Sequence, residues 1–454
     1  MAKIIKNSVL FICAVIMAMM ISILSSGLGV FEFSQTAMGA EITPQQPIGD
    51  GTAENPYQIG NAEELYWFAA QVNGGNKSIN AVLIDNITVN TNVLDSRGGV
   101  NESDFISWTP IGNSNNKYSG VFDGQGHTVR GLYFNDSSVN YVGFFGYIVD
   151  GATISNLSIA DSYLSGKFYV GGICGESEGI IKNCQNFGEI CAKGFVGGVI
   201  GDNNGTVESC KNSGAVTGEY DNVGGVCGNN NGPLKSCESI GEVNCQYNTG
   251  GICGCNSWGT IENCYYNSDI YRGKAVGYTG YGTETNVLGK TTAEFNSGEV
   301  AYLLQSDQAE TVWAQTIGTD EYPELKVFSE NSLKVAQLTT ADSTVHYANE
   351  VEDGSIIVDG TGNQFKVVLN TNAYGGEGAK YLETVNIYNN NAALTDNSTA
   401  PMYYTYDEND NNLAVFTFTN QNTAAIGTIR AEVTTKENAE AETVLYFVSK
   451  EAAF

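Results

Sequence analysis

The sequence predicts an all-β protein built around a parallel β-helix, a solenoid of coils of about 27 residues each. The first observation is a repeat whose copies begin at Val142, Val170, Val196, Val223, Thr249 and Val276, so that the starts lie 28, 26, 27, 26 and 27 residues apart. The second is that apolar residues or cysteines recur at fixed places in each copy. The third is a pair of adjacent glycines near the start of four copies.

The N-terminal segment, residues 1–40, is predicted to be a signal peptide. Two lysines precede an apolar run of about sixteen residues, and small and polar residues follow up to Ala40. This is the pattern of a secretory signal, whereas a membrane-spanning helix needs about twenty apolar residues. An uncleaved anchor is the alternative. We therefore expect a secreted or cell-surface protein that is extracellular after the signal peptide is removed.

Residues 41–141 are predicted to form an N-terminal cap and irregular first coils. Asn61 can cap a helix in which Leu65, Phe68, Ala69 and Val72 fall at i, i+3, i+4 and i+7. Such a helix can cover the open end of a solenoid, where strand edges and apolar side chains would otherwise face water. Further along, one segment predicts a structural turn between two strands, with these candidate residues: Asp123, Gly124, Gly126 and His127.

Residues 142–328 are predicted to hold the regular coils and a helical closing segment. Three apolar columns predict short strands that stack on the same residues one coil away. We place the paired glycines at the corners, where the backbone φ is positive or a side chain would meet the next coil. The columns are Ile154, Ile181, Val207, Leu234 and Ile261; Leu157, Cys184, Cys210, Cys237 and Cys264; and Tyr163, Ile190, Val216, Val243 and Ile270.

The cysteines admit three interpretations. Ten of the 11 cysteines follow the predicted signal, an even number that suits a disulfide framework in an exported protein. However, Cys184, Cys210, Cys237 and Cys264 recur with the coil, in a column that also accepts leucine, which is how a small buried apolar residue behaves. Zinc is the third alternative, but the chain has no CxxC pair and only two histidines. We interpret the column as a structural ladder and expect no metal and no cofactor.

Residues 329–454 lose the repeat. Strand-like segments such as FKVVLN and LAVFTFT alternate there with turns rich in Asn, Gly and Asp. This pattern predicts a separate antiparallel β-sandwich domain of the Ig-like type.

Charge and motifs limit the function classes. The chain has 21 basic and 50 acidic residues, a net charge of −29, and no basic run that could follow a phosphate backbone. Nucleic acid is therefore excluded as a partner. The chain has no HExxH motif and no convincing carboxylate pair, so we expect no catalysis. Four aromatic residues near the last coil are candidates for ligand binding, although they also suit packing beneath the closing segment: Trp258, Tyr265, Tyr266 and Tyr271.

Several segments in this order resemble bacterial surface proteins that carry GLUG repeats. They are GTAENPYQI, SGVFDGQGHTVRGL, the repeated VGGxxG with its NC or SC step, and SGEVAYLL followed by IGTDEYPEL. The resemblance covers roughly residues 50–328 and implies a right-handed parallel β-helix, exported by bacteria and assigned to cell-surface adhesion or interaction. Related repeats also occur beside metallopeptidase domains that cleave immunoglobulin A, but the missing HExxH prevents a transfer of that activity.

We therefore expect a secreted, non-catalytic adhesion protein whose partner is an extracellular glycan or a host or bacterial surface protein. Two alternatives remain open. One is a β-helix enzyme acting on polysaccharides, either a lyase or a glycoside hydrolase. The other is a non-catalytic accessory module of a surface peptidase system.

Overall fold

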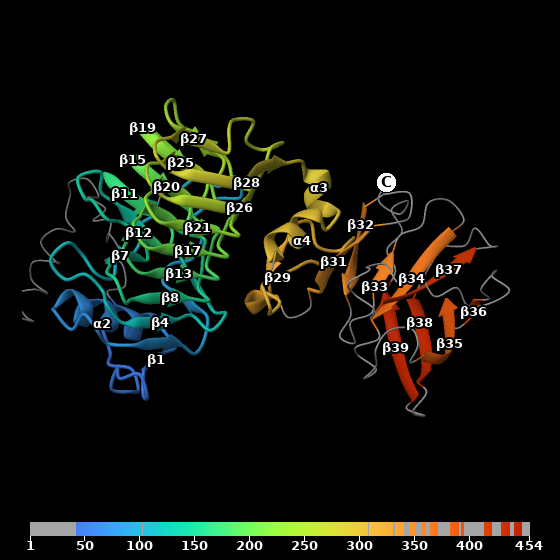
Figure 1. The fold of residues 1–454 in the computed structure, drawn as a ribbon. Coiled ribbons are helices and arrows are strands. Elements are labelled where there is room, and N and C mark those ends of the chain that lie inside the picture. The colour runs from blue at the N-terminus through green and yellow to red at the C-terminus, as the bar shows by residue number, and fades with distance from the viewer. Residues whose placement is uncertain are drawn as a thin grey trace, which may run out of the picture. The chain divides into compact units, whose positions relative to one another are not determined.

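The computed structural model describes residues 42–339 except 102, 307, 330 and 331, together with the backbone of strands between residues 345 and 446 (Figure 1). The predicted signal peptide lies outside the described residues. Within the described part of the chain, no helix combines the length and the apolar character that crossing a membrane would require.

The predicted solenoid is confirmed as about nine turns of about 27 residues. One regular coil consists of β12 (Cys174–Ser177), β13 (Ile180–Lys182), β14 (Gln185–Asn186) and β15 (Glu189–Gly197). Equivalent strands of successive coils pair in parallel, so that Ile181 lies between Ile154 and Val207. The backbone of each regular coil therefore pairs with the coil before it and the coil after it, as expected for a solenoid.

Three parallel sheets form the walls. Sheet 1 contains 15 strands, two of which are β13 and β14. The others are β1 (Tyr57–Ile59), β2 (Ala81–Leu83), β3 (Ile87–Thr88), β4 (Val121–Asp123), β5 (Thr128–Arg130), β8 (Thr153–Ser155), β9 (Ser158–Ala160), β17 (Thr206–Glu208), β18 (Lys211–Asn212), β21 (Pro233–Lys235), β22 (Glu238–Ser239), β26 (Thr260–Asn267) and β28 (Thr283–Lys290). Sheet 2 contains β15 with β6 (Tyr133–Asn135), β10 (Tyr163–Ser165), β11 (Phe168–Gly171), β19 (Val216–Gly224), β23 (Val243–Asn244) and β24 (Thr249–Gly250). Sheet 3 contains β12 with β7 (Phe145–Ile148), β16 (Ile200–Asn203), β20 (Cys227–Asn230), β25 (Cys253–Asn256) and β27 (Val276–Thr279).

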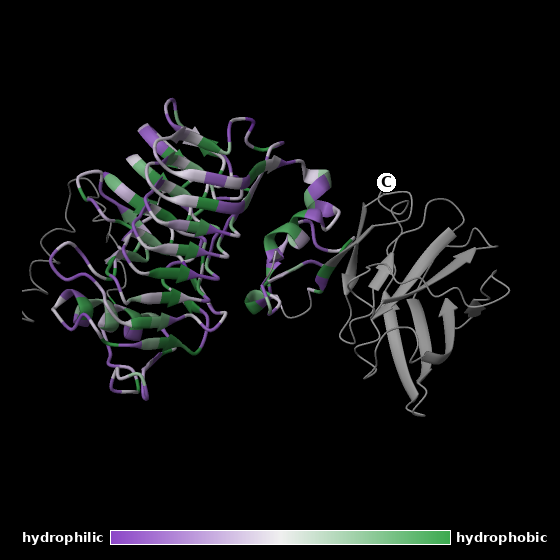
Figure 2. Cartoon of the chain, in the orientation of Figure 1, coloured by the Kyte–Doolittle hydropathy of each residue, from purple (hydrophilic) through white to green (hydrophobic). Residues whose placement is uncertain are grey.

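The core consists of apolar columns that run through the coils. Figure 2 shows hydrophobic residues along the stacked strands and hydrophilic residues in the loops that connect them. The cysteine column lies in this core: Cys184, Cys210, Cys237 and Cys264 are each 0% exposed. A second interior column on sheet 3 also contains cysteines, in the order Phe145, Cys174, Ile200, Cys227, Cys253 and Val276.

Residues other than glycine, mainly asparagine, serine and aromatic residues, occupy the positive-φ corners of the regular coils, whereas the paired glycines do not. The residue before each cysteine of the ladder is left-handed, with φ between 49° and 52° at Asn183, Ser209, Ser236 and Asn263. Asparagine tolerates this conformation because its short side chain finds local hydrogen bonds, and Asn183 Nδ2 donates to Asn156 Oδ1 at 3.1 Å. The paired glycines do not have positive φ. The expectation of glycine-led corners was wrong in this respect, and the glycines serve close packing instead.

The column predicted through Tyr163 and the register predicted for Val276 need correction. Ile190 pairs with Leu164, so that Tyr163 lies one position away from the column. At the other end Ile270 is 40% exposed and lies outside any strand. Val276 pairs with Cys253, which makes this last step 23 residues long (276 − 253) instead of about 27. The terminal coils therefore deviate from the period of the interior.

Helix α2 (Ala62–Asn73) packs on the first coils, as the sequence predicts. The Asn61 side chain accepts a hydrogen bond from Glu64 N at 2.9 Å, and the four predicted apolar residues are buried. Phe68 contacts Tyr118 and Phe122, with ring centroids 6.0 and 5.8 Å apart. The helix thereby covers apolar side chains at the N-terminal end of the solenoid.

The segment after the last coil packs on the flank of sheet 1. It contains α3 (Thr292–Asn296), α4 (Glu299–Gln305), β29 (Trp313–Ala314), β30 (Glu324–Leu325) and the 3₁₀ helix η1 (Lys326–Phe328). Its apolar residues form a cluster with Tyr265, and Trp313 Nε1 donates to Ser236 O at 3.2 Å. Lys211, which is 1% exposed, lies 3.1 Å from Glu238 and 3.2 Å from Glu324. This flank segment thus bridges several coils from the side.

The C-terminal strands form two antiparallel sheets. The first contains β31 (Lys334–Thr339), β32 (Val345–Glu350), β33 (Ile356–Val358), β34 (Gln364–Asn370) and β37 (Leu413–Thr419). The second contains β35 (Leu382–Asn389), β36 (Ala392–Leu394), β38 (Thr428–Thr435) and β39 (Glu440–Tyr446). The predicted change from parallel to antiparallel pairing is therefore present.

We expect Cys245 to be the most reactive thiol of the native protein. All ten cysteines of the described residues are free, and only Cys191 and Cys245 are not buried. Burial raises the pKa of Cys191 to about 12, so this thiol is protonated at neutral pH and slow to react. Alkylation followed by mass spectrometry should label Cys245 first, and the other nine only after denaturation. Native disulfides in the same experiment would contradict the ladder interpretation.

Candidate functional site

The four aromatic residues predicted from the sequence do not gather in one place. Tyr265 is 2% exposed and packs against the flank segment in a cluster with Phe295 and Trp313. Tyr266 belongs to the solenoid core, where Tyr271 contacts it edge-on with ring centroids 5.9 Å apart. Trp258 differs from these three because its side chain is 66% exposed.

Trp258 lies in a corner between sheets 3 and 1 that is one residue longer in the last two coils than in the three coils before them. In three earlier coils, residues in register on the two sheets lie three positions apart: 177 and 180, 203 and 206, 230 and 233. The corresponding pairs at the end, 256 and 260 and then 279 and 283, lie four positions apart. One residue is thus inserted at the same corner in two successive coils. Trp258 and Tyr281 lie within these two corners.

The two inserted corners bring Trp258 and Tyr281 together. Their rings stack with centroids 4.3 Å apart and an interplanar angle of 20°. Both remain largely in solvent, since Tyr281 is 77% exposed. We call this pair the aromatic corner. Water-exposed stacked rings offer a flat apolar surface to a ligand, which is unusual for side chains whose only role is packing.

A ladder of polar side chains on the outer face of sheet 3 leads to the aromatic corner. Asn229 Nδ2 donates to Asp202 Oδ1 at 2.8 Å, and Ser257 Oγ donates to Asn229 Oδ1 at 2.7 Å. Asn231 Nδ2 also reaches Asp202 Oδ1, at 3.3 Å. Because Ser257 directly precedes Trp258, this polar ladder places hydrogen-bonding groups beside the exposed rings.

Carboxylates make the same face acidic. Burial raises the pKa of Asp202 and that of Glu176, which lies in register with Asp202 one coil earlier. The hydroxyl of Tyr147 donates to Glu178 at 2.8 Å and, with Lys117, holds the pKa of Glu178 below its ordinary value. Among the described residues no ion pair involves Glu176 or Asp202. The face therefore presents acceptors more than donors.

The polar ladder is not arranged as a hydrolytic pair. Hydrolysis by two carboxylates requires one protonated acid and one ionised partner on either side of the substrate bond. Asp202 is 9% exposed, and the amides of Asn229, Asn231 and Asn204 surround its oxygens. This carboxylate is thus an acceptor within a structural ladder.

The predicted turn at residues 123–127 has local structural contacts. Asp123 Oδ1 accepts hydrogen bonds from Gln125 N and Asn156 Nδ2, both at 2.9 Å. His127 N donates to Gly124 O at 2.8 Å, and Gly126 has a φ of 79°. A Cβ atom on Gly124 would lie 2.3 Å from Asn156 O. These residues connect β4 to β5 and the first coils to the next.

In the described residues no group of three or more His, Cys, Asp or Glu side chains is arranged to hold a metal ion.

Tyr281 and the polar ladder were missed by the sequence reasoning. The glycine pairs match Val276 with Thr249, whereas in the structure Val276 pairs with Cys253. This difference in register hid the second insertion. Counting residues between the polar turn and the next apolar column would have shown one extra residue, next to an aromatic side chain, in both terminal coils.

Comparisons with known proteins give partial matches. No family model matches the chain, and no solved structure matches it significantly. A putative Gly-rich membrane protein of Evansella cellulosilytica is 31% identical over 138 residues, which cover 30% of this chain and 15% of that protein. Halomucin of Haloquadratum walsbyi is 29% identical over 147 residues, which cover 31% of this chain and 2% of halomucin. The chain thus matches only a small part of each relative.

Proposed function

We propose that this protein is a secreted or cell-surface interaction module that binds an extracellular glycan at the aromatic corner and has no catalytic activity. The observation that carries the proposal is the insertion of one residue in two successive coils, which places Trp258 on Tyr281 in solvent. A coil without the inserted residue at either position would not present this exposed apolar surface.

A glycan suits the chemistry of this region. The C–H faces of sugar rings stack on aromatic rings, and sugar hydroxyls donate hydrogen bonds to neighbouring acceptors. The aromatic corner offers the first contact, and the partly exposed Ser257, which directly precedes Trp258, offers hydrogen-bonding groups beside the rings. The net charge of −29 favours a neutral or cationic glycan over a polyanionic one.

The surface location and the finer fold assignments belong to the same proposal. The names of the two relatives, a membrane protein and a halomucin, support a surface location. The order of the quoted motifs supports membership among GLUG-repeat proteins with a right-handed helix. The two antiparallel sheets between residues 334 and 446 support an Ig-like sandwich as the C-terminal domain.

Replacing either ring of the aromatic corner should weaken glycan binding. We expect Trp258→Ala and Tyr281→Ala each to raise the dissociation constant about tenfold, because each removes roughly 1.4 kcal/mol of stacking. A glycan array identifies the ligand, and titration calorimetry measures the variants. Tyr247→Ala is the matched control, since Tyr247 is 67% exposed at a different corner and should be neutral.

Two outcomes would contradict this function. If no glycan on the array binds, while a surface protein binds the wild-type chain and binds Trp258→Ala and Tyr281→Ala more weakly, the ligand is a protein. If the purified chain releases reducing ends or unsaturated sugars from polysaccharides, the protein is an enzyme.

A further inference from the structure

The two ends of the solenoid are closed differently. Helix α2 packs over the N-terminal coils, where Leu65, Phe68 and Val72 are 0% exposed. At the other end, and within the described residues, β27 pairs only with β25 and β28 pairs only with β26. The second backbone edge of each of these strands therefore remains available for hydrogen bonding.

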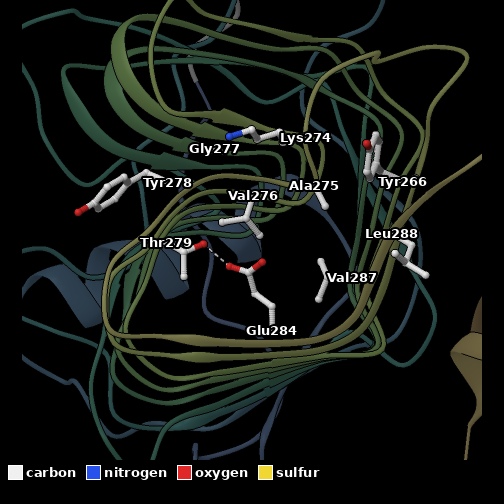
Figure 3. Close-up of a pocket in the computed structure, with 11 residues that line it drawn as sticks. Tyr266, Lys274, Ala275, Val276, Gly277, Tyr278, Thr279, Glu284, Val287 and Leu288 are labelled. Carbon is white, nitrogen blue, oxygen red and sulfur yellow. Dashed lines mark hydrogen bonds between the residues drawn. The ribbon is translucent and has the colours of Figure 1, made fainter.

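The C-terminal end also contains a cavity of about 610 Å³. Figure 3 shows the side chains of Val276, Val287 and Glu284 inside the ring of backbone formed by the last coils. Val276 and Val287 continue the interior columns of Cys253 and Cys264. Leu288, on the rim, is 51% exposed. The apolar interior of the solenoid thus reaches solvent at this end.

Glu284 interrupts one of the apolar columns. It lies in register with Ile261, which follows Leu234 and Val207 in the same column. Its carboxylate accepts a hydrogen bond from the hydroxyl of Thr279 across the corner that joins β27 to β28. A charge at an otherwise apolar position prevents indiscriminate pairing of an open edge and selects a partner that supplies the opposite charge.

The opposite charge is present on the same end. Lys274 also lines the cavity and is exposed, and neither Lys274 nor Glu284 has an ion-pair partner among the described residues. In a two-fold symmetric contact, residue i of one copy faces residue j of the other, and j faces i. One unpaired cation and one unpaired anion on a single surface therefore make that surface self-complementary.

We propose that the open C-terminal end of the solenoid is the contact surface for a second copy of this chain. The two solenoids meet end to end about a two-fold axis, with Glu284 of each copy opposite Lys274 of the other. The last strands pair as antiparallel edges, and the two cavities join into one enclosed interior. Because α2 covers the other end, association stops at two copies instead of growing into a fibre.

A charge exchange tests this contact. We expect the full chain to have the mass of a dimer by light scattering at micromolar concentration. Glu284→Lys and Lys274→Glu should each weaken association at least about tenfold, because each places like charges opposite one another. The double variant Glu284→Lys/Lys274→Glu should restore the dimer, since it restores opposite charges.

The matched control is Lys235→Glu on the flank of sheet 1, which should leave the dimer intact. Circular dichroism melting of every variant separates loss of association from loss of folding. The proposal is overturned if the wild-type chain is monomeric up to about 100 μM, if the single variants dimerise normally, or if the double variant stays monomeric. Binding of a different protein to this end of a monomeric chain is also a contrary result.

Discussion

Replacing Lys211 by methionine is expected to lower the free energy of unfolding by about 3 to 5 kcal/mol. The Lys211 ammonium is enclosed by three oxygens, at 3.1 Å from Glu238, 3.2 Å from Glu324 and 2.6 Å from the carbonyl of Pro323. Methionine fills a similar volume but leaves Glu238, which is 0% exposed, without a cation. Such an uncompensated buried carboxylate is strongly destabilising, and the contact with the flank segment is lost as well. Denaturant unfolding measures the difference.

Lys235→Met provides the matched comparison. Lys235 lies 3.1 Å from Glu262, but the two side chains are 44% and 42% exposed. An ion pair in water contributes between 0 and about 1 kcal/mol, because solvent screens it and two long side chains must be ordered. Equal losses in the two variants would contradict a special role for the buried pair.

The cost of Lys211→Met should also depend on pH. Burial raises the pKa of Glu238 to about 7, although Lys211 opposes this shift. A carboxyl group whose pKa is higher in the folded than in the unfolded chain contributes most below its unfolded value of 4.5, and this contribution is lost as the pH rises towards 7. Without Lys211 the ionised form of Glu238 is even less stable in the folded chain. Lys211→Met should therefore lower the free energy of unfolding more at pH 8 than at pH 5. The additional change Glu238→Gln should remove that difference.

The repeat is the part of the fold that the sequence predicts well. Each interior coil must place an apolar side chain on the same residue of its neighbours, so Cys184, Cys210, Cys237 and Cys264 recur at a nearly constant spacing. Helix α2 was also predictable, because Asn61 and the i, i+3, i+4 pattern are local signals. Such features depend on short-range regularity.

The flank segment and the candidate site depend on tertiary contacts that the repeat does not encode. Lys211 occupies a position where the neighbouring coils have Gln185 and Glu238, and its burial depends on contacts with Pro323 and Glu324, more than a hundred residues later. Trp258 was recognised as a candidate from its residue type, but its partner Tyr281 became apparent only from the register of the strands. Which residues occupy the positive-φ corners could not be predicted either, since glycine and asparagine both tolerate positive φ.

Replacing Gly198 by alanine is expected to lower the free energy of unfolding by about 3 kcal/mol. A Cβ atom at Gly198 would lie 2.1 Å from Asn212 Cγ and 2.4 Å from the backbone oxygen of Gly225 in the next coil. Asn212 cannot move away cheaply, because it is 0% exposed, its Oδ1 accepts from Asn186 Nδ2 at 2.9 Å, and its Nδ2 donates to Gly214 O at 2.9 Å. The methyl group must therefore separate two coils or break a buried asparagine ladder. For a domain of this size such a loss lowers the melting temperature by about 6 to 12 °C.

The same reasoning predicts which glycines tolerate alanine. Gly225→Ala should be as harmful as Gly198→Ala, since its Cβ atom would lie 2.2 Å from the backbone oxygen of Gly251, and each coil contacts only its neighbours. Gly99→Ala should change stability by less than about 0.5 kcal/mol, because its nearest contact is Asp95 Oδ2 at 3.4 Å and its φ is not positive. Circular dichroism melting of the three variants ranks them. If Gly198→Ala has the same melting temperature as the wild type, the coils are not as closely stacked at their glycine pairs as these contacts require.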